Sequence, residues 1–134
     1  MLSFNKMEKR RVVIIDDNQV TCLILSEMLE KIQLHITCFN EAESALEYLQ
    51  KEANNHGNLP DIIFLDINLP AMDGWDFLNE FIEMNTHLVK RIDIYMISSS
   101  ISEHDMEKAR GFSIVKGYLV KPIEENDIRK ILLK

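Results

Sequence analysis

Five short apolar runs, separated by amphipathic stretches, constrain the fold of this chain more than any other feature. The runs lie at residues 12–15, 34–39, 62–65, 92–97 and 114–120. Short runs rich in β-branched and aromatic residues are typical of strands, and the unbroken ones are typical of strands buried on both faces. The stretches between the runs repeat apolar residues at helical spacing. Strict alternation of strand and helix predicts an α/β fold with helices on both faces of a five-stranded parallel sheet.

The amphipathic stretches supply the apolar stripes that such helices would pack on the sheet. The expected stripes are Val20, Leu23, Ile24, Met28 and Ile32; Ala42, Ala45, Leu46, Leu49 and Ala53; Trp75, Leu78, Phe81 and Ile82; and Ile128, Ile131 and Leu132. Asn40 and Glu43 resemble a capping box at the start of the second helix. Ser102 and Asp105 are expected to cap the fourth helix, which Gly111 ends.

The length and composition fit one globular domain over residues 1–134, with residues 1–10 as a polar extension and no output domain. The formal net charge of −7 repels nucleic acid phosphates, so direct nucleic acid binding is not expected. No apolar run is long enough to span a membrane. A cytoplasmic protein is therefore expected, with Cys22 and Cys38 as reduced, buried thiols rather than a disulfide.

Polar side chains follow the apolar runs at the points where the predicted strands end. Asp16 and Asp17 follow the first run, Asp66 the third, Ser98 the fourth and Lys121 the fifth. In an open parallel sheet, ligands bind outside the carboxyl ends of the strands, where the strand order reverses. If the order is 2-1-3-4-5, the first and third strands are neighbours at that point, and the three aspartates converge.

Three converging carboxylates repel one another, and a bound divalent cation removes the conflict. A ligand set made only of oxygens favours Mg²⁺ or another hard ion over zinc. Asp17 and Asp66 are each expected to supply an oxygen, and Asp16 to act directly or through water. The backbone carbonyl of Asn68 is a further candidate ligand.

The same residues have the parts needed for phosphoryl transfer. Asp66 can act as the nucleophile and form an aspartyl phosphate. Lys121 and the metal would neutralise charge on the phosphoryl oxygens, and the Ser98 hydroxyl would donate to one of them. Each feature alone is common turn or loop chemistry, and Tyr118 alone is an ordinary packed aromatic. The combination, in order and at the ends of predicted buried strands, carries the interpretation.

These residues resemble the motifs of the response regulator receiver family of two-component signalling. The matching segments are Ile14-Ile15-Asp16-Asp17-Asn18, Asp66-Ile67-Asn68-Leu69-Pro70-Ala71-Met72-Asp73-Gly74, Ile97-Ser98-Ser99 and Gly117-Tyr118-Leu119-Val120-Lys121-Pro122. The resemblance implies a flavodoxin-like, doubly wound fold with strand order 2-1-3-4-5. It also implies that Asp66 accepts a phosphoryl group from a sensor histidine kinase or a phosphotransfer protein. Such a domain is not an enzyme, although it assists its own phosphorylation and dephosphorylation.

The resemblance further assigns roles to individual residues. Asp16, Asp17 and the Asn68 carbonyl would hold Mg²⁺, and the Lys121–Pro122 peptide bond is expected to be cis. Phosphorylation would draw Ser98 toward the phosphoryl group, and Tyr118 would then turn inward. That movement would alter the face formed by the fourth helix, fifth strand and last helix, where a downstream protein would bind.

Two other functions compete with this interpretation. The first is a receiver-like scaffold that binds proteins without phosphorylation. The second is a phosphatase of the haloacid dehalogenase type with Asp16 as nucleophile, although Asn18 stands where that family needs an acid. Flavodoxin-like FMN binding is disfavoured because Asp16 and Asp17 would repel the phosphate. The phosphate-binding sequence GxxxxGK[ST] is absent.

Overall fold

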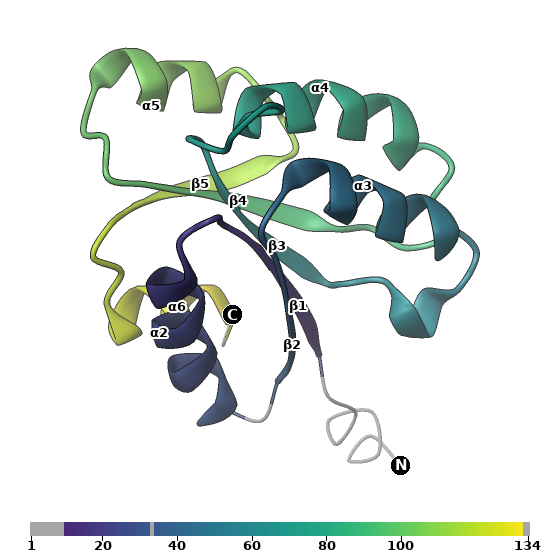
Figure 1. Cartoon of the computed structure of the whole chain (residues 1–134), viewed down its shortest axis with the longest axis horizontal. Coiled ribbons are helices and arrows are strands. Elements are labelled where there is room, and N and C mark those ends of the chain that lie inside the picture. Colours follow the sequence, from purple (N-terminus) through teal and green to yellow (C-terminus); the bar gives the residue numbers. More distant parts are fainter. Residues whose placement is uncertain (1–9, 33, 133–134) are drawn as a thin grey trace.

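The structure, a computed structural model, describes residues 10–32 and 34–132. The elements, in chain order, are β1 (Arg11–Ile15), α2 (Gln19–Glu30), β2 (His35–Phe39), α3 (Ala42–Lys51), a 3₁₀ turn (His56–Asn58), β3 (Ile62–Asp66), α4 (Gly74–Asn85), β4 (Asp93–Ser98), α5 (Glu103–Arg110), β5 (Val115–Val120) and α6 (Glu125–Leu132) (Figure 1). The extension expected over residues 1–10 lies outside the described residues, apart from Arg10. None of the described helices has the length and apolar character needed to cross a membrane.

The strands form one parallel sheet with the order β2-β1-β3-β4-β5, as predicted. Each apolar run in the sequence became one strand, with bounds that differ by a residue or so. Because β1 and β3 are adjacent, with Ile15 paired to Leu65, their carboxyl ends lie side by side. The strand order therefore brings the residues that follow these two strands to a single edge of the sheet.

The sheet separates two hydrophobic cores, as expected for strands buried on both faces. On β1, Val13 and Ile15 point into one core, whereas Val12 and Ile14 point into the other. Helices α3, α4 and α5 cover the first face, and α2 and α6 cover the second (Figure 1). Successive side chains of a strand point to opposite faces of the sheet. A strand that is buried on both faces therefore needs an apolar residue at every position.

The stripe expected for α2 was only partly right, because Met28 and Ile32 pack against the core but the other three residues do not. Val20, Leu23 and Ile24 are 61%, 60% and 46% exposed, and the helix packs through Cys22, Leu25 and Leu29 instead. Both sets of residues have helical spacing, so periodicity alone could not choose between them. The helix therefore carries a second apolar face, which is exposed to solvent beside the carboxyl edge of the sheet.

Of the two helix caps expected from the sequence, the structure lacks the one at α3 and contains the one at α5. The capping box of Asn40 and Glu43 was wrong, because α3 begins one residue later, with Glu41 at its N-cap and no side-chain cap hydrogen bond. The cap of α5 was confirmed: the Ser102 side chain accepts from the backbone N–H of Asp105, and Gly111 lies at the C-cap.

The expectation of two reduced thiols was also wrong. Cys22 on α2 and Cys38 on β2 form a disulfide, with a Cα–Cα distance of 6.5 Å. Helix α2 packs on the sheet face beside β2, and this packing brings together two cysteines that are 16 residues apart in the sequence. Cys22 is buried, as expected, but Cys38 is exposed on the edge strand.

Candidate functional site: a carboxylate cluster at the carboxyl ends of β1 and β3

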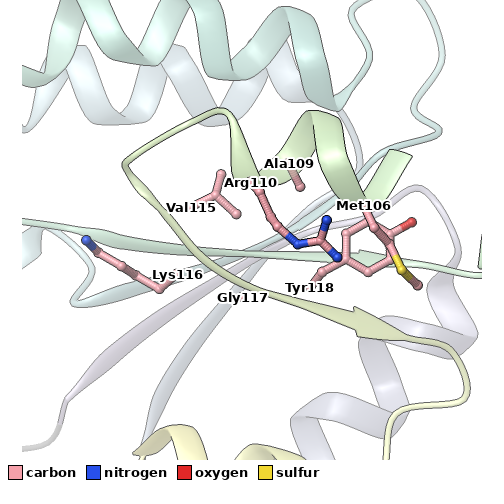
Figure 2. A pocket seen from close by; sticks show the side chains of 7 residues that line it. All are labelled: Met106, Ala109, Arg110, Val115, Lys116, Gly117 and Tyr118. Carbon is pink, nitrogen blue, oxygen red and sulfur yellow. The ribbon is translucent and has the colours of Figure 1, made fainter. Parts of the chain in front are cut away.

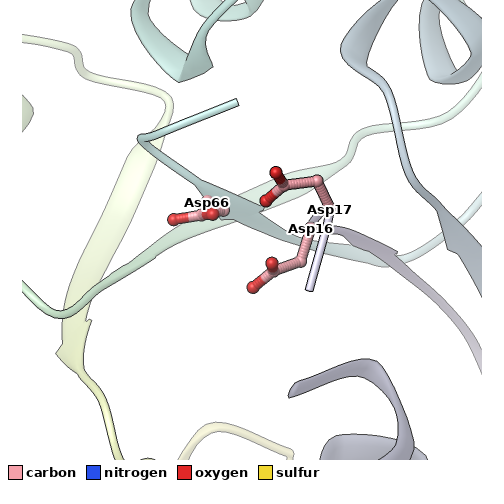
Figure 3. A group of neighbouring side chains, drawn as sticks. All are labelled: Asp16, Asp17 and Asp66. Carbon is pink, nitrogen blue, oxygen red and sulfur yellow. The ribbon is translucent and has the colours of Figure 1, made fainter. Parts of the chain in front are cut away.

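The three aspartates singled out in the sequence meet at one point of the structure. Asp16 and Asp17 follow β1, and Asp66 is the last residue of β3. One carboxylate oxygen from each residue lies within 4.8 Å of the others. Figure 3 shows the carboxylates gathered between the two strand ends. Asp16 and Asp66 are buried, with exposed fractions of 0% and 4%, whereas Asp17 is exposed to solvent.

Asp16 is held in place from two sides. Its backbone N–H donates to the carbonyl of Phe39, at the end of β2, over 3.0 Å. Its Oδ1 atom accepts from the backbone N–H of Asn18 over 2.8 Å. The Asn18 side chain in turn caps α2 by accepting from the N–H of Val20. The start of α2 and the end of β2 thus fix the Asp16 carboxylate together.

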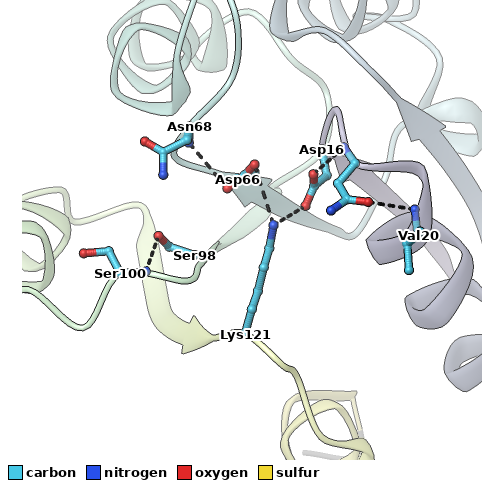
Figure 4. A network of polar contacts seen from close by, with 8 residues as sticks. Asp16, Val20, Asp66, Asn68, Ser98, Ser100 and Lys121 are labelled. Carbon is cyan, nitrogen blue, oxygen red and sulfur yellow. Dashed lines mark hydrogen bonds and ion pairs between the residues drawn. The ribbon is translucent and has the colours of Figure 1, made fainter.

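Lys121 brings the counter-charge to the cluster from the end of β5. Its Nζ atom lies 2.8 Å from Asp16 Oδ2 and 3.7 Å from Asp66 Oδ2 (Figure 4). The peptide bond between Lys121 and Pro122 is cis, the conformation that the resemblance implies. The Lys121 backbone N–H donates to the Ser98 carbonyl over 2.8 Å, which ties this loop to the end of β4.

Burial raises the pKa of Asp66 to about 6. The neighbouring Asp16 carboxylate adds to the rise, and Lys121 opposes it without cancelling it. The charge of one ammonium group therefore does not offset the burial of Asp66 and its repulsion by the neighbouring carboxylate. An additional cation would favour the ionised form of Asp66, which is the nucleophilic form.

The donor set fits a hard divalent cation. Asp16 Oδ2 is buried and accepts no well-directed hydrogen bond, although the Lys121 ammonium lies close to it. A buried carboxylate oxygen in that state can still accept a metal ion. No sulfur or imidazole ligand belongs to this group of described residues, so its oxygen chemistry favours Mg²⁺ over zinc.

The loop after β3 returns close to the Asp66 backbone because of Gly74. A β-carbon at Gly74 would lie 2.6 Å from the Asp66 carbonyl oxygen and 2.9 Å from the Cα of Ile67. The Gly74 N–H donates to the Ile67 carbonyl over 2.9 Å. A capping box between Asp73 and Asp76 then starts α4. Within the loop, Asn68 lies exposed and donates its backbone N–H to Asp66 Oδ1 over 3.4 Å.

Ser98 connects the cluster to the next element of the fold. It is fully buried at the end of β4, and its Oγ accepts from the backbone N–H of Ser100 over 3.0 Å (Figure 4). The Ser100 hydroxyl donates to Asp105 in the first turn of α5 over 2.8 Å. The Tyr118 hydroxyl donates to the Ser100 carbonyl over 2.9 Å. Ser100 therefore links Ser98 to both α5 and β5.

The comparisons with known proteins agree with this geometry. The profile of the response regulator receiver domain matches residues 12–133. The chain belongs to this family. As a receiver domain, it is a signalling domain of the kind found in two-component systems, and the phosphatase alternative is not favoured.

Individual relatives and solved structures are similar to this chain over most of its length. The chain is 23% identical to the probable methanogenesis regulatory protein FilR2 of Methanothrix harundinacea, over 89% of this chain and 76% of that protein. It is 31% identical to the two-component response regulator ORR26 of rice, over 90% of this chain and only 19% of that protein. Chemotaxis protein CheY4 of Vibrio cholerae shares the fold, with a TM-score of 0.77, 23% identity and coverage of 94% and 98% of the two chains.

Receiver domains interact with histidine kinases or phosphotransfer proteins and with downstream targets. A hybrid histidine kinase of Dictyostelium discoideum contains a segment 27% identical to 92% of this chain, which spans 7% of that protein. Receiver domains bind Mg²⁺ in an acidic pocket, and this chain has a cluster of three aspartates, Asp16, Asp17 and Asp66.

The sequence predicted the convergence of the three aspartates and Lys121 but missed the contacts around Ser100. A serine run after a strand predicts a turn, and nothing local in it indicates a partner on another element. The hydrogen bonds to Asp105 and Tyr118 depend on how α5 and β5 pack. The exposed apolar face of α2 was missed for the same reason.

Proposed function

We propose that this receiver domain accepts a phosphoryl group on Asp66 and that the reaction depends on Mg²⁺. The observation that carries the proposal is the convergence of three carboxylates and the Lys121 ammonium at the ends of β1, β3 and β5. A carboxylate oxygen of Asp66 would attack the phosphorus of the donor and release the donor group. Asp16, Asp17 and Asp66 would hold Mg²⁺, with the Asn68 backbone carbonyl as a further ligand.

The chain's own residues assist this transfer in the proposal. Lys121 sits between Asp16 and Asp66, where its charge would also neutralise an equatorial phosphoryl oxygen. Ser98 accepts a hydrogen bond through Oγ, which leaves its own hydroxyl hydrogen available to donate to another phosphoryl oxygen. Bound Mg²⁺ would supply the remaining positive charge. The same groups would serve when water removes the phosphoryl group.

The exposed apolar face of α2 favours a protein as the phosphoryl donor. Val20, Leu23 and Ile24 lie on the first two turns of α2, directly after the aspartates. A groove of about 290 Å³ continues from Ile24 to Lys121, so apolar surface and site residue line one depression. We propose that a histidine kinase or phosphotransfer protein packs here, in the cytoplasm, and presents its phosphohistidine to Asp66.

Output is proposed to pass through α5, β5 and α6. Tyr118 lines a pocket of about 280 Å³ between α5 and β5, together with Arg110 and Lys116 (Figure 2). Movement of Ser98 toward a phosphoryl group would disturb the Ser98–Ser100 hydrogen bond and, through the Ser100 carbonyl, the contact with Tyr118. A downstream protein that contacts this pocket would then read the state of Asp66.

The proposal is tested by intact mass after incubation with acetyl phosphate, with Mg²⁺ and with EDTA. Transfer to Asp66 releases acetate and adds one phosphoryl group to the protein. Wild type should gain it only with Mg²⁺, and Asp66→Asn should not gain it. Asp127→Asn, on α6, is the matched control and should behave as wild type. An unmodified wild type would favour the scaffold function, and donor hydrolysis that survives Asp66→Asn would favour a phosphatase.

A further inference from the structure

The disulfide between Cys22 and Cys38 joins the two segments that hold Asp16. Cys22 donates its backbone N–H to the carbonyl of Asn18 over 3.2 Å, in the first turn of α2. Cys38 directly precedes Phe39, whose carbonyl accepts from the N–H of Asp16. Because Asn18 and Phe39 both bond to Asp16, the disulfide closes a ring of contacts around that residue.

The two cysteine residues differ in their exposure to solvent. Cys22 is only 9% exposed, on the buried face of α2, whereas Cys38 lies exposed on the edge strand β2. The Ser26 hydroxyl lies 3.8 Å from the Cys38 sulfur, where it can donate to a thiolate. A dissolved thiol can therefore reach Cys38 without unfolding the domain. Cys22 is then the leaving group, and it can re-form the disulfide when the protein is oxidised again.

We propose that Cys22 and Cys38 form a reversible thiol–disulfide site and that the oxidised form braces the Asp16 end of the carboxylate cluster. Disulfides in a reducing compartment, such as the cytoplasm proposed above, are mostly transient or redox-sensing rather than structural. The Cα–Cα distance of 6.5 Å lies within the range that a disulfide bridges without backbone movement. The link to the metal cluster rests on the proposed function, but the exchange chemistry does not.

The exchange balances with a dithiol as reductant. A thiolate of the dithiol attacks the sulfur of Cys38, a mixed disulfide forms there, and Cys22 leaves as a thiolate that takes a proton from water. The second thiol of the reductant then attacks the reductant's own sulfur and releases Cys38. The protein gains two electrons and two protons, and the dithiol becomes a disulfide. In the reverse direction, a low-molecular-weight disulfide such as oxidised glutathione is reduced.

The first experiment measures the redox state in the folded protein. The protein is equilibrated with mixtures of reduced and oxidised glutathione, quenched with acid, alkylated in denaturant and weighed intact. Two alkyl groups should be added under reducing conditions and none under oxidising conditions, and the change should reverse. Cysteines that stay oxidised until urea is added, or that never oxidise, would overturn the proposal. Ser26→Ala should reoxidise more slowly than wild type, whereas Ser44→Ala, on α3, should not.

The second experiment measures whether the disulfide braces the cluster. Mg²⁺ alone is titrated by calorimetry into the oxidised protein, the reduced protein and the Cys22→Ala/Cys38→Ala variant. The oxidised form should bind Mg²⁺ more tightly than the other two, by roughly fivefold or more, if the coupling has the usual size. Equal affinities would refute the bracing. Neither experiment uses a phosphoryl donor, so a failure of Asp66 to accept phosphate would not affect either result.

Discussion

The ammonium of Lys121 lies 2.8 Å from the buried carboxylate of Asp16, and it is the described cation closest to Asp66 as well. In the metal-free protein, Lys121→Ala would leave the Asp16 charge buried without this partner. We expect a loss of about 2–3 kcal/mol of stability, less than for a fully buried pair because the ammonium is partly solvated. Urea unfolding in EDTA measures the loss, and added Mg²⁺ should recover more stability in the variant than in wild type.

Lys116→Ala is the matched control for this substitution. Lys116 lies on β5, the strand that precedes Lys121, is exposed, and donates its ammonium only to the Ser113 carbonyl among the described residues. Its removal should change stability by less than about 0.5 kcal/mol. Equal losses in the two variants would show that the contact between Lys121 and Asp16 contributes nothing specific.

Burial raises the pKa of Asp66 to about 6, so the ionised carboxyl destabilises the metal-free fold. Because the pKa of Asp66 is higher in the folded state than in the unfolded state, the native state keeps the Asp66 proton to higher pH. The contribution of Asp66 to the free energy of unfolding therefore falls as pH rises from about 4 to about 6. Asp66→Asn removes this penalty. The variant should exceed wild type in stability at pH 7.5, by at most about 3 kcal/mol. Near pH 4 the difference should largely vanish.

Urea unfolding in EDTA at several pH values checks this prediction. Glu124→Gln, an exposed carboxyl before α6, should leave the pH profile as in wild type. A stability difference between Asp66→Asn and wild type that stays constant from pH 4 to pH 7.5 would contradict the origin proposed for the gain. Excess Mg²⁺ should reverse the order of stability, because it binds the ionised wild type more tightly.

Most of the fold and the charged part of the site could be predicted because each signal was local. Each buried run marks a strand, and the residue after it is at the carboxyl edge whatever the helices do. Asp16, Asp66 and Lys121 therefore needed only the strand order to be brought together.

The missed features depend on packing between elements. Helix α2 carries two apolar stripes of helical spacing, and only its packing into the hydrophobic core on this face of the sheet selects Cys22, Leu25 and Leu29. That selection also places Cys22 against β2, which the reduced-thiol expectation overlooked. The start of α3 at Ala42 rather than Glu41 made the pairing of Asn40 with Glu43 wrong by one position.

Gly74→Ala should disturb the backbone of β3 at Asp66, the proposed phosphoacceptor. Its β-carbon would lie 2.6 Å from the Asp66 carbonyl oxygen, so the loop or the strand end must move. We expect a loss of about 1–3 kcal/mol on thermal or urea unfolding and slower phosphorylation by acetyl phosphate. Gly57→Ala is the control, since its β-carbon would meet only the Asn55 side chain, at 3.7 Å. A Gly74→Ala variant as stable and as reactive as Gly57→Ala would disprove the close approach.

Tyr118→Phe removes the hydroxyl that donates to the Ser100 carbonyl over 2.9 Å. The loss of one partly buried hydrogen bond should cost about 0.5–1.5 kcal/mol. The Ser100 amide, which donates to Ser98, should shift in the NMR spectrum of the variant, although Tyr118 does not contact the aspartates in any described hydrogen bond. Tyr95→Phe, on the neighbouring strand, is the control and should leave the Ser100 amide unmoved. If phosphorylation of wild type moves the Ser100 amide but leaves the ring resonances of Tyr118 unmoved, the tyrosine does not report the state of Asp66, and the proposed output path through β5 fails.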